Sequence, residues 1–79
     1  LANITIDNKE IKIIKARFQE ENIKKTGIIT EISKNTFGIT CKNGIIYLEE
    51  IKQAGKKQMK INSFINGIKI DDYLNKKVN

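Results

Sequence analysis

The chemistry that this chain most clearly offers is phosphate binding by lysine. Gly55, Lys56 and Lys57 form a short basic loop, and Lys60 follows three residues later. Glycine lets the backbone turn, and each lysine presents its ammonium group to a phosphate as a point charge. The pattern predicts phosphate contacts from this loop, and an ordinary solvated loop fits the composition equally well.

Catalytic side chains are scarce. The sequence has no histidine and one cysteine, Cys41, which removes histidine-based bases, activated nucleophile pairs and thiolate zinc sites. The paired carboxylates are sequence neighbours, which point to opposite faces of a strand. They are Glu20-Glu21, Glu49-Glu50 and Asp71-Asp72. The Gly55–Lys57 loop lacks the upstream glycine and the Ser or Thr of a P-loop. We therefore expect no catalysis, cofactor or metal in this chain.

Length and charge predict one small domain with a polyanionic partner. Seventy-nine residues make a single domain, 1–79, with a thin core. Fifteen Lys and Arg against nine Asp and Glu give a net charge of +6, which favours nucleic acid or, less often, an anionic membrane. Abundant Ile, Lys and Asn are also typical of A/T-rich coding sequence, so codon bias remains an alternative for part of the charge.

The setting of the chain is predicted from three smaller features. A lone cysteine fits a reducing, cytoplasmic environment. No apolar run approaches the ~20 residues of a membrane span, so we expect no membrane partner. The chain begins at Leu1, and we expect it to be a piece of a longer protein.

Glycine and asparagine divide the chain into strand-length segments. The expected strands are 3–6, 10–19, 27–33, 37–42 and 45–52. Asn43-Gly44 between two apolar runs predicts a hairpin with a type I′ turn. Counting outward from this turn pairs Ile39 with Leu48.

The strand at 10–19 changes parity within its length. Ile11 and Ile13 share one face, whereas Ile14, Ala16 and Phe18 share the other. A bulge near Ile13-Ile14 would turn all five inward. It would also gather three basic residues on the outer face: Lys12, Lys15 and Arg17.

The last third of the chain predicts one helix. A loop spans 53–58, and a helix over 60–66 carries Ile61, Phe64 and Ile65 at the spacing of a buried stripe. Gly67 is placed to end it. A brief extended segment and a frayed tail over 71–79 follow. The fold class predicted is mostly β, a small OB-like open barrel with one short helix.

Residues 54–59 (Ala-Gly-Lys-Lys-Gln-Met), followed by Phe64-Ile-Asn-Gly67, resemble the C-terminal domain of methionyl-tRNA formyltransferases. Residues 4–6, 12–16, 27–29 and 41–44 agree in order with the strands of that domain, so the resemblance covers about 3–70. The chain departs from the family at several positions. Lys60 stands where a serine would cap the helix, and Ser63 stands where an acidic residue would complete the capping box.

This resemblance implies an OB-like barrel that follows a formyltransferase domain. That catalytic domain would use formyl-tetrahydrofolate to formylate initiator methionyl-tRNA, and the C-terminal domain would offer tRNA a basic surface. Its partners would be tRNA and the N-terminal formyltransferase domain. The residues predicted to contact phosphates are Lys56, Lys57 and Lys60, then Lys12, Lys15, Arg17 and Lys42. Tyr47 is a candidate stacking residue, and an ordinary partly buried strand tyrosine fits the sequence at least as well.

Two other functions stay open on the sequence. The chain could be a protein-interaction module that docks on the catalytic domain of a formyltransferase acting on another substrate, with its lysines merely solvated. An independent binder of single strands is less favoured, because the five aromatic residues are mostly needed for the core.

Overall fold

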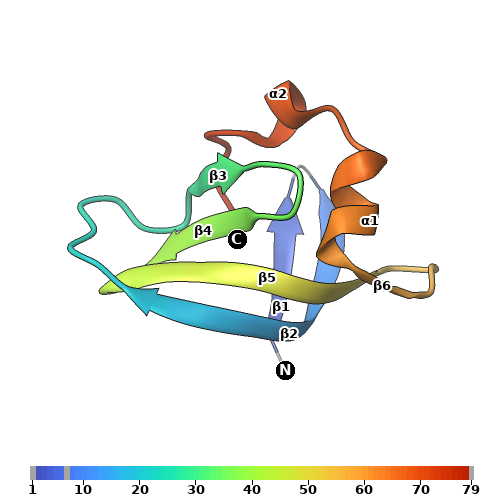
Figure 1. The fold of residues 1–79 in the computed structure, drawn as a ribbon, viewed down its shortest axis with the longest axis horizontal. Coiled ribbons are helices and arrows are strands. Elements are labelled where there is room, and N and C mark those ends of the chain that lie inside the picture. Colours follow the sequence, from blue (N-terminus) through green and yellow to red (C-terminus); the bar gives the residue numbers. More distant parts are fainter. Residues whose placement is uncertain (1, 7, 79) are drawn as a thin grey trace.

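The computed structural model describes residues 2–6 and 8–78. In this part of the chain an antiparallel sheet has the strand order β1-β2-β5-β4-β3, and β6 pairs with a further stretch of β5 (Figure 1). The elements are β1 (Ala2–Ile6), β2 (Lys9–Glu20), β3 (Ile29–Ile32), β4 (Phe37–Cys41), β5 (Gly44–Gln53), β6 (Gln58–Lys60), α1 (Ile61–Asn66) and α2 (Ile70–Tyr73). The predicted mostly β, open-barrel class is confirmed, with a second short helix added to the one predicted.

A double irregularity bends the long β2–β5 pair. The partners across the bend are Ile13–Ile51, Lys15–Glu50 and Ala16–Leu48. Ile14 on β2 and Glu49 on β5 are therefore each an extra residue without a partner in the register. The bulge predicted on β2 is confirmed, and a second one faces it. Bulges increase local twist and bend a strand, and both strands curve across the whole sheet in Figure 1.

The bulge does not bury every apolar side chain of β2. Ile11 is buried, but Ala16 and Phe18 are exposed, and Phe18 keeps 54% of its surface accessible. As predicted, both lie on the inner face of the sheet, opposite Leu48 and Ile46, but they are not buried there. Helix α1 packs on β5 and β6, so it covers the opposite end of the sheet (Figure 1). The Phe18 end lacks such a layer.

The β4–β5 hairpin turns one residue earlier than predicted, which shifts its pairing register by two. Cys41 pairs with Gly44 and Ile39 with Ile46, so the turn residues are Lys42 and Asn43, the latter at φ 68°. The predicted pairing of Ile39 with Leu48 is wrong, although a shift of two residues leaves every side chain on its predicted face.

Gly44 belongs to β5 for a reason of packing. A Cβ at this position would overlap the backbone oxygen of Gln19 and the ring of Phe18. Glycine is needed here for close approach between β2 and β5, and the turn of the hairpin does not use it.

Three aromatic rings fill the end of the core beneath the helices. Phe37, Phe64 and Tyr73 are buried, and their ring centroids lie 5.9–6.5 Å apart in tilted or edge-on arrangements. Helix α1 confirms the helix predicted over 60–66, and Gly67 follows it. The predicted loop at 53–58 is shorter, because β5 runs to Gln53 and β6 begins at Gln58.

The C-terminal segment is hydrogen-bonded to β3 and to the residues before it. The N–H of Asn75 donates to the Ile29 carbonyl (2.8 Å), and the N–H of Val78 donates to the Gly27 carbonyl (2.7 Å). Ile70, which was expected in an extended segment, begins α2. Residues 71–78, expected to be frayed, thus have partners because Tyr73 anchors them in the core; Asn79 lies outside the described residues.

Candidate nucleic-acid interface

One face of the sheet gathers basic side chains from three strands. Residues directly opposite in an antiparallel ladder share a face. The relevant partners are Lys12–Lys52, Lys15–Glu50, Arg17–Tyr47 and Glu50–Lys60. Ile11 and Ile51, next to Lys12 and Lys52, are buried on the other side. We call the outer set the basic face, and its members, all exposed, are Lys12, Lys15, Arg17, Lys52 and Lys60.

The predicted site residues fall into three places. Lys12, Lys15, Arg17 and Lys60 belong to the basic face. The turn from β5 to β6 carries the two lysines of the glycine loop, Lys56 and Lys57. Lys56 lines a hollow at the helical end, together with Met59, Phe64 and Tyr73 among others.

Lys42 is separated from the other predicted residues. It lies in the turn before β5, whereas the glycine loop follows the end of that strand. The two ends of β5 lie at opposite sides of the sheet in Figure 1, so Lys42 and the glycine loop cannot contact the same phosphate.

Sequence reasoning did not include Lys52 among the site residues. The structure places it opposite Lys12, where two cations stand side by side on neighbouring strands. Strict alternation from the inward Leu48 would place Lys52 on the inner face. The bulge at Glu49 reverses this, so that Ile51 points inward and Lys52 outward.

Carboxylates divide the basic face. Lys15, Glu49, Glu50 and Lys60 line one shallow hollow. A phosphate that approaches this part of the surface meets two cations and two anions. The local field is therefore weaker than the number of lysines suggests. Lys12 and Lys52 line another hollow with one carboxylate, Glu10, so that position is more favourable for a phosphate.

Arg17 is stacked on Tyr47. The guanidinium carbon lies 4.4 Å from the ring centroid, within the range of a cation–π contact. The ring also lies against Gly38, where a Cβ would come within 3.1 Å of a ring carbon. Tyr47 is thus held on the outer face by both neighbours, and its predicted role in stacking a base stays a prediction.

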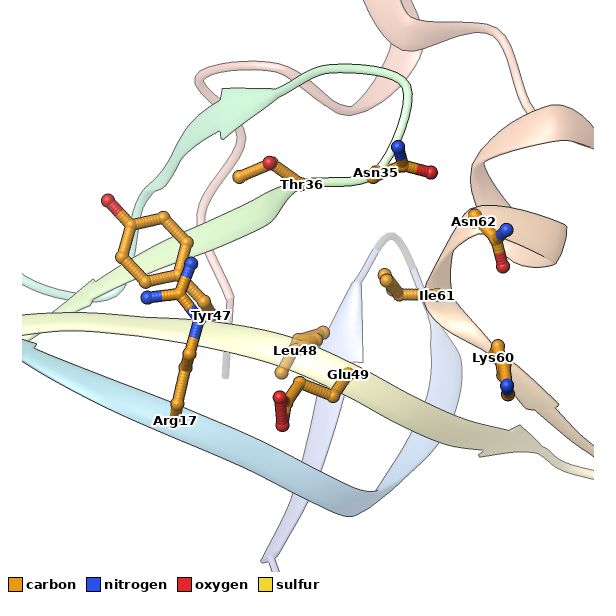
Figure 2. A pocket seen from close by; sticks show the side chains of 9 residues that line it. All are labelled: Arg17, Asn35, Thr36, Tyr47, Leu48, Glu49, Lys60, Ile61 and Asn62. Carbon is orange, nitrogen blue, oxygen red and sulfur yellow. The ribbon is translucent and has the colours of Figure 1, made fainter.

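A groove opens beside this stacked pair (Figure 2). Its volume is about 260 Å³, and it is lined by Arg17, Asn35, Thr36, Tyr47, Leu48, Glu49, Lys60, Ile61 and Asn62. It lies on the edge of β5 where β4 stops pairing at Tyr47 and β6 starts at Glu50. Sequence reasoning missed this groove.

The described residues lack two further kinds of feature, a cluster of metal ligands and a membrane-spanning helix. Residues 2–6 and 8–78 hold no group of three or more potential His, Cys, Asp or Glu ligands. Neither helix in these ranges is long and apolar enough to cross a membrane.

Comparison with known families decides the relationship. Residues 2–69 match the family model described as the formyl transferase C-terminal domain. The chain belongs to this family. Among its relatives are proteins named methionyl-tRNA formyltransferase: the one from Clostridium novyi (strain NT) is 36% identical over 66 residues, 82% of this chain and 21% of the relative. The one from Dictyoglomus turgidum is 37% identical over 67 residues, which cover 80% of this chain and 21% of the relative.

A third relative extends the range of organisms. The methionyl-tRNA formyltransferase of Campylobacter lari is 32% identical over 56 residues, covering 68% of this chain and 18% of its own length. This formyl transferase C-terminal domain spans about a fifth of the length of the relatives that it matches. The resemblance found in the glycine–lysine loop and the earlier strands is confirmed.

Proposed function

We propose that this domain holds tRNA on its basic face for a formyltransferase domain of the parent chain. The observation that carries the proposal is the register that turns five basic residues of β2, β5 and β6 to one side of the sheet. Membership in the formyl transferase C-terminal family supports it. The remaining four fifths of the parent enzyme would supply catalysis and bind formyl-tetrahydrofolate, in the cytoplasm.

The proposed role is to provide affinity and leave base reading to other parts of the enzyme. Lysine contacts to phosphate fix position and carry little sequence information. An interface of this kind binds with a Kd on the order of 10⁻⁴–10⁻⁶ M near physiological salt. In the parent enzyme, tRNA held here would raise the effective concentration of its acceptor end at the catalytic domain.

A salt-dependent titration tests this proposal. Labelled tRNA is titrated with the domain at several salt concentrations, with fluorescence anisotropy as the readout. We expect log K to fall linearly with log salt, because each phosphate contact releases counterions. Replacing Lys12 and Lys15 together by glutamine should lower the slope by roughly two, one for each lost contact.

The matched control removes the same charge elsewhere. Lys24 and Lys25 are exposed in the segment before β3 and are not part of the basic face. The double glutamine variant there should retain the wild-type slope. Equal losses in both double variants would refute a defined face, and a Lys56→Ala/Lys57→Ala variant with unchanged affinity and slope would exclude the glycine loop.

A second function is favoured by a different observation. Phe18 is 54% exposed at the end of the sheet that the helices leave uncovered, which suits docking on a catalytic domain, the alternative without RNA binding. A Phe18→Ser variant of the parent enzyme would then lose formylation while tRNA affinity stays the same. No tRNA binding by the domain even at low salt would also favour docking.

A further inference from the structure

The groove lies along one edge of β5, between the stretch that pairs with β4 and the stretch that pairs with β6. β4 occupies this edge from Gly44 to Tyr47, and β6 occupies it from Glu50 to Lys52. The intervening residues, Leu48 and Glu49, have no strand partner there. An added peptide strand would need a longer row of exposed backbone groups, so a gap of two residues favours a compact ligand over a peptide.

The walls of the groove combine a stacking platform with hydrogen-bonding groups. The Arg17 guanidinium lies over the Tyr47 ring on one side, and the amide side chains of Asn35 and Asn62 stand on the opposite rim in Figure 2. An asparagine amide both donates and accepts hydrogen bonds, and a guanidinium plane can stack on a base. These groups match the flat ring and the polar edge of a nucleobase.

Charge in the groove gives such a ligand an orientation. Lys60 stands at the rim, and the half-buried Glu49 lines the same groove, with its carboxylate apart from Lys60 in Figure 2. A phosphate would be attracted to Lys60 and repelled from Glu49. Between these side chains and Tyr47 lie the buried Leu48 and Ile61, which give the groove an apolar floor. A base would therefore lie inward, and its phosphate would remain at the rim.

We propose that this groove receives one unstacked nucleotide of the bound RNA, with its base on Arg17 and its phosphate at Lys60. The inference rests on the proposed RNA-binding function and assigns that interface a specific subsite. The volume, about 260 Å³, is just below the roughly 300–1,000 Å³ of sites for drug-sized ligands. One nucleotide suits this space, and a base of any identity can stack on a guanidinium plane.

The test uses small probes observed by NMR. Adenosine 5′-monophosphate and ribose 5-phosphate are titrated separately into the ¹⁵N-labelled domain. We expect the side-chain amides of Asn35 and Asn62 and the backbone amides of Leu48 and Glu49 to shift with the nucleotide and much less with ribose 5-phosphate. Arg17→Lys keeps the charge but loses the planar platform, and should weaken nucleotide binding roughly tenfold.

Controls separate this subsite from the wider interface. Lys24→Gln removes a distant charge and should leave the nucleotide affinity unchanged. Equal shifts with ribose 5-phosphate would mean an anion site and overturn the inference, as would shifts caused by an extended peptide but not by the nucleotide. If the domain binds tRNA but its amide signals do not shift with the nucleotide, the subsite alone is overturned. If it binds neither tRNA nor the nucleotide, the proposed function is overturned as well.

Discussion

The two faces of the β2–β5 pair differ in composition although they share one backbone. On the inner face Ile11 and Ile51 are buried, and on the outer face Lys12 and Lys52 are exposed. Because side chains alternate along a strand, the same two strands supply apolar surface to the core and charge to solvent. Stability and the proposed binding of tRNA therefore depend on different residues, and substitutions on one face should spare the property of the other.

The largest expected effect is on the inner side. Phe64→Ala removes a ring that contacts both Phe37 and Tyr73 and should reduce the free energy of unfolding by about 3–5 kcal/mol. This approaches the roughly 3–5 kcal/mol that a core of this size supplies. Urea unfolding followed by circular dichroism measures the loss.

The outer-face counterpart makes the comparison quantitative. Lys12→Ala should change the free energy of unfolding by about 0.5 kcal/mol or less, as for other surface sites. If Phe64→Ala does not fold, Phe64→Leu serves as the milder variant. Similar losses from the inner and the outer substitution would contradict the division between the faces.

A medium effect is expected where the two strands approach most closely. Gly44→Ala places a methyl group against the Gln19 carbonyl and the Phe18 ring, and such overpacking costs about 1–3 kcal/mol. Adding Phe18→Ala should not restore stability, because the backbone oxygen remains. The control is Gly67→Ala, where the nearest atom is 3.7 Å away. Thermal melts that rank the two glycine variants equally would refute this explanation.

The smallest effect concerns a residue that belongs to both sides of the comparison. Lys60 is the N-cap of α1, with extended backbone (φ −74°, ψ 154°) and no side-chain cap hydrogen bond, and it also lies on the basic face. Lys60→Ser should stabilise the domain by about 1 kcal/mol, which raises Tm by roughly 4–8 °C. It should also lower the salt slope of tRNA binding by about one.

Lys60→Gln separates these two consequences. It removes the charge without supplying a good cap, so the salt slope should fall while the melting temperature stays near that of the wild type. Equal melting temperatures for the serine and glutamine variants would show that capping does not limit the stability of this helix.

Local patterns predicted the parts of the fold that depend on neighbours in sequence. The parity change at Ile13-Ile14 located the bulge, and the spacing of Ile61, Phe64 and Ile65 located α1. The facing bulge at Glu49 was visible only as two buried residues, Leu48 and Ile51, spaced three apart in a strand.

Features that depend on distant residues were missed or misplaced. Asn43-Gly44 has the local preference for a turn, but contacts with Gln19 and Phe18 placed the glycine within β5. Tyr73 is buried only because Phe37 and Phe64 are present to receive it. The groove arises where β4 ends and β6 begins on one edge of β5, which is a property of topology that no single segment encodes.

The pairing of the C-terminal segment with β3 has a consequence for motion. Ile28 and Lys77, which are far apart in the sequence, form an antiparallel β-bridge. The backbone N–H groups of Ile29, Asn75 and Val78 donate hydrogen bonds between the same two segments. A short terminal segment can detach without unfolding the aromatic core. Hydrogen exchange at these amides should therefore proceed by local opening, faster than exchange in the centre of β5, and each opening transiently exposes the outer edge of β3.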